Sequence, residues 1–125
     1  MEWVVHVGLA ELAVGGLLGW AMVLKDQRPD LIERIGIKVP ARIRQVHLDY
    51  VMMGLILIAV GLAVPSLADP IAIALVFGTI VNPLLFVPPA FEPEVERRVW
   101  YRAIAIVSFV CVSGGLVATA ITGPG

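Results

Sequence analysis

The stretch His47–Leu67, HLDYVMMGLILIAVGLAVPSL, decides the fold of this chain of 125 residues. A histidine and an aspartate stand at its start, and the apolar run that follows, from Tyr50 to Ala68, contains no charged residue. A helix needs about 20 mainly apolar residues to cross the hydrocarbon core of a bilayer. The stretch therefore predicts a membrane-spanning helix over residues 48–68, with His47 at its mouth.

Three further segments have the same length and character, at residues 3–24, 70–91 and 101–122. Hydrophobic residues make up 59% of the chain and charged residues 15%, and the mean hydropathy is +0.94, which excludes an ordinary soluble domain. The apolar segments show no alternation with a period of two, so a membrane β-barrel is not expected. We predict an all-α fold: an integral membrane four-helix bundle that forms one domain over residues 1–125.

The basic residues predict how the bundle is oriented. All nine Lys and Arg side chains lie in two connecting regions, and none lies at either terminus. By the positive-inside rule, both termini are expected outside, and the loops 25–46 and 92–100 are expected in the cytoplasm, in a bacterial inner membrane.

The first loop contains PDLIERIGIKVP, which predicts a short interfacial helix from Pro29 or Asp30 to Gly36. Pro88 and Pro89 are expected to end the third membrane helix. The sequence contains no stripe of basic residues that could follow a phosphate backbone, so nucleic-acid binding is not expected.

Glu11 is the only charged residue within the first membrane segment. It lies on a helix face with Gly8, Gly15 and Gly19, so it is expected to point toward protein rather than lipid. An ionisable group inside a membrane is expensive and often functional. Two interpretations stay open: a functional carboxyl group, or a protonated and hydrogen-bonded one that fixes helix packing.

His47 is the main candidate for a ligand. A neutral imidazole at the head of a membrane helix, preceded by Arg42 and Arg44, suits an axial ligand for haem iron, and the arginines suit its acidic groups. Tyr50 and Gly54 continue the same helix face and are expected to bind the cofactor as well. The small residues on this face leave a shallow channel that suits either a flat ring or another closely packed helix.

Asn82 is the only amide side chain within the predicted spans, and Pro83 follows it. Because proline lacks an N–H, the carbonyl of Thr79 loses its helical donor. Either Asn82 or Thr79 satisfies the loosened backbone, or a kink opens a cavity in which Asn82 meets a ligand. Asp49 is two residues from His47, about 200° around an ideal helix, so it is not expected to pair with the imidazole.

Together, HLDYVMMGLILIAVGLAVPSL (47–67) and FGTIVNPLL (77–85) resemble the small membrane family of styrene oxide isomerase and hydroxylaminobenzene mutase. The resemblance implies a homotrimer of four-helix subunits in the lipid bilayer, with haem b near the subunit boundary. It also implies that His47 ligates the iron and that Asn82 orients the substrate. Ferric iron would act as a Lewis acid on the substrate oxygen without net redox change.

Three positions depart from that family pattern. Met53 replaces an asparagine that positions substrate, Gly78 replaces an aspartate, and Phe86 replaces a tyrosine. The leading hypothesis is a haem-dependent isomerase that acts on a small lipophilic epoxide or N-hydroxy compound. One alternative is a haem-binding membrane protein without catalysis, and another is a small proton-coupled transporter that uses Glu11.

Overall fold

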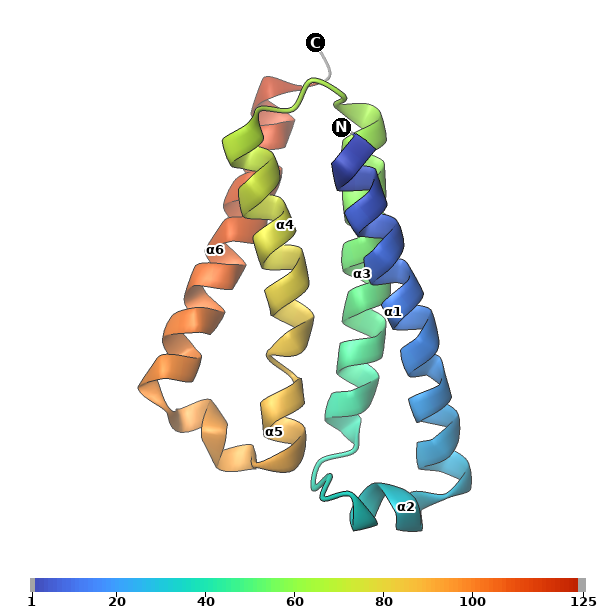
Figure 1. The fold of residues 1–125 in the computed structure, drawn as a ribbon. Coiled ribbons are helices and arrows are strands. Elements are labelled where there is room, and N and C mark those ends of the chain that lie inside the picture. Colours follow the sequence, from blue (N-terminus) through green and yellow to red (C-terminus); the bar gives the residue numbers. More distant parts are fainter. Residues whose placement is uncertain (1, 124–125) are drawn as a thin grey trace.

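The computed structural model describes residues 2–123 as an all-α bundle without strands (Figure 1). Four stretches of helix are long and apolar enough to cross a membrane, which confirms the predicted class of an integral membrane bundle. The helices, in chain order, are α1 (Glu2–Gln27), α2 (Pro29–Arg34), α3 (Ala41–Ala63), α4 (Asp69–Leu84), α5 (Val87–Phe91), the 3₁₀-helix η1 (Pro93–Arg97) and α6 (Val99–Thr122).

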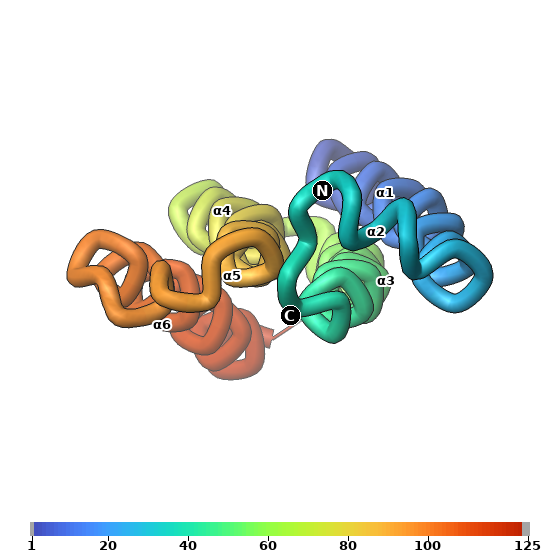
Figure 2. Tube along the Cα trace, turned by 90° about the horizontal axis from the view of Figure 1, so that it is seen from below, coloured from blue at the N-terminus to red at the C-terminus, as the bar shows by residue number. Residues whose placement is uncertain are grey.

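The four long helices form two pairs. Figure 1 and Figure 2 show α1 lying along α3 and α4 lying along α6, and these two pairs have the most extensive contacts in the bundle. Contacts between α3 and α4, and fewer between α1 and α4, join the pairs along a seam. The start of α1 and the end of α6 lie at one end of the bundle, while α2 and α5 lie at the opposite end.

Glycine residues allow α1 and α3 to approach at backbone distance. A Cβ atom placed on Gly54 would lie 2.7 Å from the carbonyl oxygen of Gly8 and 2.8 Å from the amide nitrogen of Leu12. A Cβ atom on Gly15 would lie 2.9 Å from the amide nitrogen of Val51. Lipid is as apolar as the side chains, so helices in a membrane associate largely through such close packing.

Glycine residues also allow α4 and α6 to approach closely. A Cβ atom on Gly78 of α4 would lie 2.9 Å from the carbonyl oxygen of Ser108 in α6. One on Gly115 of α6 would lie 2.7 Å from the side chain of Leu75. Between the pairs, fully buried aliphatic side chains fill the upper half of the bundle, among them Val4, Leu57 and Leu75.

Helix α3 begins earlier than the sequence suggested. It starts at Ala41 after Pro40, so Arg42 and Arg44 lie within the helix rather than in the loop before it. His47 is six residues from the helix start, or about 9 Å along its axis at 1.5 Å per residue. The predicted start was placed at His47, after the arginines, but charged side chains near a membrane surface do not interrupt a helix.

The third membrane helix also differs from the prediction. Pro83 lies inside α4, which ends at Leu84, and Pro88 and Pro89 belong to the first turns of α5. The expectation that these two prolines end the helix is therefore wrong. A proline is tolerated in a first helical turn, since the N–H groups there have no helical acceptor. The short helix predicted to begin at Pro29 or Asp30 is confirmed as α2, and Gly36 lies after it with a φ of 95°. Its place in the membrane interface stays a prediction.

We expect Gly54→Ala to destabilise the bundle by about 1–3 kcal/mol, because its Cβ atom would meet the backbone of α1, which cannot move aside locally. The measurement is denaturant-induced unfolding in detergent micelles. Gly114→Ala is the matched control, since a Cβ atom there meets nothing within 4 Å. That variant should be neutral or stabilised by up to about 1 kcal/mol through helix propensity. Equal effects of both substitutions would contradict the close crossing.

Candidate functional site

His47 points from α3 toward α1. Its Nδ1 atom lies 2.5 Å from the carbonyl oxygen of Gly15. A carbonyl oxygen only accepts hydrogen bonds, so Nδ1 must carry the proton and donate it. In the neutral imidazole, the lone pair is then on Nε2. Histidines that bind metals are commonly oriented in this way, with the second ring nitrogen donating to a backbone carbonyl.

The surface of α1 beside His47 is made of glycine. A Cβ atom on Gly19 would lie 3.5 Å from Cε1 of His47, and one on Gly16 would meet nothing within 4 Å. Gly54, by contrast, is buried against α1. From the sequence, the channel at Gly54 could accept either a flat ring or another helix. The structure shows that a helix, α1, packs there.

The two arginines that precede His47 have different surroundings. Arg42 is partly buried, donates a hydrogen bond of 2.8 Å to Gln45 and forms an ion pair with Glu96 of η1. Its charge therefore already joins α3 to η1. Arg44 is exposed and forms no ion pair within residues 2–123. It is three residues before His47, so it lies on the same side of α3, one turn nearer to the helix start.

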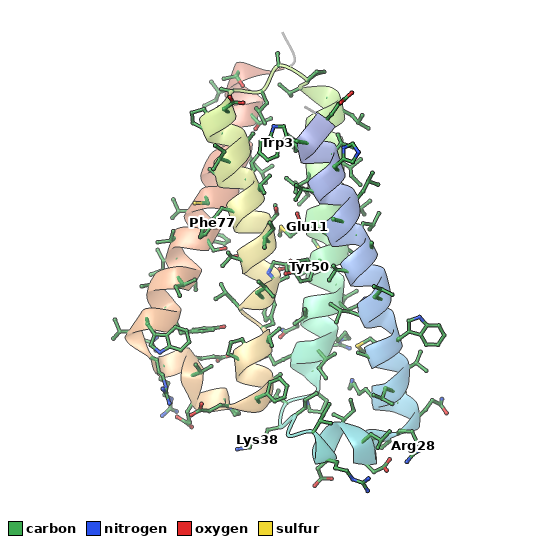
Figure 3. The ribbon with its side chains drawn as sticks, viewed as in Figure 1. Trp3, Glu11, Arg28, Lys38, Tyr50 and Phe77 are labelled. Carbon is green, nitrogen blue, oxygen red and sulfur yellow. The ribbon has the colours of Figure 1, made fainter. Side chains whose placement is uncertain are left out.

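Tyr50 connects the two helix pairs rather than facing an open site. Its side chain is 6% exposed, and its hydroxyl donates a hydrogen bond of 3.0 Å to the carbonyl oxygen of Ile80 in α4. Figure 3 shows the side chain directed from α3 toward α4. The hydroxyl therefore bonds to α4, and the structure does not show the predicted contact of Tyr50 with a cofactor.

Asn82 lies in a cavity between α3, α4 and α6. Its Oδ1 atom accepts a hydrogen bond of 2.8 Å from the hydroxyl of Ser108, a partner that nothing in the sequence indicated beyond its place among small residues. The hydroxyl of Ser108 also lies 3.3 Å from the carbonyl oxygen of Gly78, so its single proton is shared between two acceptors. In this orientation of the amide, the Nδ2 group of Asn82 is left to donate toward the cavity. The volume of the cavity is about 650 Å³. Its other lining residues are Asp49, Met53, Leu85, Phe86, Tyr101, Ala105, Ile106, Phe109 and Val110.

The cavity is mostly apolar, with a few polar groups. Tyr101 was not singled out from the sequence as a site residue, although it lines the cavity and its hydroxyl donates to the carbonyl oxygen of Leu85 at 2.5 Å. Asp49 contributes a carboxyl group, which agrees with its expected position away from the imidazole of His47. Two of the three positions that depart from the family pattern, Met53 and Phe86, line the same cavity.

His47 and Asn82 are not brought together within one chain. The imidazole contacts α1, whereas the cavity that contains Asn82 lies on another face of α3. Gly78, the third departure, lies in the contact between α4 and α6, where an aspartate side chain has no room. The residues predicted from the sequence therefore form two separate places in the subunit, one at His47 and one at Asn82.

Glu11 is buried at the seam between the helix pairs and is 4% exposed. Its Oε2 atom lies 3.0 Å from the hydroxyl oxygen of Thr79 in α4. Within residues 2–123 its Oε1 atom has no hydrogen-bond partner. The expectation that Glu11 points toward protein is confirmed, and Figure 3 shows it between α1 and α4, near Tyr50.

Within residues 2–123, no three His, Cys, Asp or Glu side chains come together in a way that could hold a metal ion. Comparisons with family models, with curated proteins and with solved structures each give no match. The resemblance to the isomerase and mutase family therefore stays a prediction from the sequence.

Proposed function

We propose that this chain is a haem b-dependent membrane isomerase that rearranges a small lipophilic epoxide or N-hydroxy compound without net redox change. The observation that supports the proposal best is the state of His47, whose Nδ1 proton is donated to the carbonyl of Gly15. This contact orients the ring and leaves the Nε2 lone pair for an iron atom. Bound haem would supply a ferric iron that acts as a Lewis acid on the substrate oxygen.

The glycine surface of α1 fits a flat ring beside His47. A Cβ atom on Gly19 would lie 3.5 Å from Cε1 of the imidazole, and one on Gly16 would meet only open space. Arg44 is the arginine that would meet an acidic group of the cofactor, because it is exposed and lies one turn from His47. Arg42 is already paired with Glu96, so it would serve to hold the helix end in place instead.

The cavity around Asn82 would bind the substrate. Its volume of about 650 Å³ is within the range of pockets that bind small molecules. Exposed apolar residues of α6, Ile106, Phe109 and Val110, form part of its wall, so a lipophilic substrate would enter from the bilayer. The Nδ2 group of Asn82 would donate to the substrate oxygen, while Ser108 holds the amide in that orientation.

A complete site would require two subunits under this proposal. Since His47 and the Asn82 cavity lie on different faces of α3, haem held by one subunit would meet the cavity of its neighbour. Such an arrangement agrees with the homotrimer that the family resemblance implies. The glycines on the outer face of α1 would allow the cofactor or a neighbouring helix to approach closely.

Haem binding is tested with full-length protein purified in detergent and supplemented with haem. We expect a Soret absorption band that is lost in His47→Ala and retained in His6→Ala. His6 is the matched control, because its Nδ1 atom also lies near a backbone carbonyl, that of Glu2, but at an exposed position. Protein that stays colourless after supplementation would refute haem binding and would favour the transporter alternative.

Catalysis is tested separately, by incubating haem-loaded protein with styrene oxide-like epoxides and N-hydroxyarylamines. We expect turnover, and a decrease in kcat/KM of at least about tenfold in Asn82→Ala, since the loss of one productive hydrogen bond is worth about 1.4 kcal/mol. The Soret band of that variant should be unchanged, which controls for folding. Haem-loaded protein that turns over neither compound class would instead indicate the non-catalytic haem protein.

The proposal also includes the orientation in a bacterial inner membrane. The basic residues cluster around α2 and η1, at the end of the bundle opposite to the start of α1 and the end of α6. The positive-inside rule then places this basic end in the cytoplasm. A reporter fused after Gly125 should be active only when it requires export. Activity of a reporter that works only in the cytoplasm would reverse the orientation.

A further inference from the structure

The hydroxyl group next to Glu11 has two neighbouring acceptor oxygens but only one proton to donate. The hydroxyl oxygen of Thr79 lies 3.0 Å from Oε2 of Glu11 and 3.1 Å from the carbonyl oxygen of Val76. A threonine hydroxyl carries one proton, and neither a carbonyl nor an ionised carboxylate carries any. With an ionised Glu11, the two acceptors must share this single proton in a weaker, bifurcated hydrogen bond, or one of the contacts brings two lone pairs together.

A proton on Glu11 resolves this shortage. If Oε2 is protonated, it donates to the hydroxyl oxygen of Thr79, and the hydroxyl donates its own proton to the carbonyl of Val76. Both contacts are then hydrogen bonds with a donor and an acceptor. Oε1 becomes the carbonyl oxygen of a neutral acid, for which burial without a partner costs far less than for a charged group.

Because Glu11 lies between the two helix pairs, its proton affects how the pairs are held together. The Glu11–Thr79 contact joins α1 to α4, and the hydrogen bond of Tyr50 to Ile80 joins α3 to the next residue of α4. The other polar contacts between membrane helices lie within the pairs, such as His47 with Gly15 and Ser108 with Asn82. Two neighbouring residues of α4 thus carry the polar contacts of the seam, and one of the two contacts depends on a proton.

We propose that Glu11 is a proton-binding site in the membrane interior and that release of its proton loosens the seam between α1 and α4. The site is independent of haem and of the proposed isomerase reaction, neither of which uses Glu11. Its ligand is a proton, because the geometry lacks one proton and the carboxyl group has a single hydroxyl partner. When the proton leaves, the hydroxyl of Thr79 must divide its single proton between two acceptors, and a buried carboxylate remains.

Among the residues that the structure describes, Asp49 and Tyr50 of α3 are the titratable groups whose charges interact with Glu11. The only titratable residue of α4, Asp69, is its first residue, ten positions before Thr79. Asp49 lines the cavity near Asn82 and could itself bind a proton. The test must therefore separate Glu11 from Asp49.

The first test is labelling of the full-length protein in detergent with dicyclohexylcarbodiimide, a lipophilic reagent that adds to protonated carboxylic acids. Mass spectrometry of peptides should locate the adduct on Glu11. Labelling should be lost in Glu11→Gln, persist in Glu33→Gln, whose carboxyl group is exposed on α2, and weaken as the pH rises. Sodium ions at constant pH should have no effect.

Two results of this labelling would overturn the proposal. Absence of an adduct on Glu11 in folded wild-type protein would show that the site does not exchange with its surroundings. Protection of Glu11 by sodium ions at constant pH would show that a monovalent cation is the ligand. Because the adduct is located in the wild-type protein, neither result depends on the folding of a variant.

The second test is thermal unfolding as a function of pH. The folded seam requires the protonated form of Glu11, so the midpoint temperature of the wild type should fall as the pH rises above about 4.3, the ordinary pKa of a glutamic acid. The fall should persist in Asp49→Asn and disappear in Glu11→Gln, whose amide can donate to Thr79 as the protonated acid does. A fall that disappears in Asp49→Asn and persists in Glu11→Gln would assign the proton to Asp49 instead.

Discussion

The backbone contact between α1 and α3 is the constraint on which the rest of this bundle depends. Gly8, Gly15 and Gly54 remove the side chains that would otherwise keep the two helices apart. Only at this distance can the imidazole of His47 reach the carbonyl of Gly15. The same contact fixes the rotation of α1, and this rotation directs Glu11 toward Thr79 of α4. The hydrogen bond of His47 and the direction of Glu11 thus both follow from one glycine-mediated crossing.

The division into two helix pairs explains why the polar residues do not form a single site. Each pair is held by close backbone packing and by a polar contact of its own, at His47 in one pair and at Ser108 in the other. The seam between the pairs has aliphatic packing together with the contacts of Glu11 and Tyr50. A side chain on α3 therefore faces one of three surroundings according to its rotation: α1, the seam, or the cavity beside α6.

Rotation about α3 also determines what the sequence could predict at the candidate site. The 100° turn per residue correctly separated Asp49 from His47, because both lie on one continuous helix. The same reasoning placed Tyr50 and Gly54 beside His47, but it could not identify the neighbour that each would meet. Tyr50 bonds to α4 and Gly54 packs on α1. Arg42, expected to meet a cofactor, pairs with Glu96, which is 54 residues away in the chain.

The sequence by itself determined the number of helices long and apolar enough to span a membrane, the short helix α2 and the inward direction of Glu11, because these depend on local composition and helical period. The partners of Glu11, Asn82 and Tyr50 were decided only by the tertiary structure, and so were the start of α3 and the place of Pro88 and Pro89 in α5. The reason is physical. A hydrogen bond between two helices requires that both side chains lie at the same depth in the bundle and point toward each other, and a single stretch of sequence does not determine the position of the second helix.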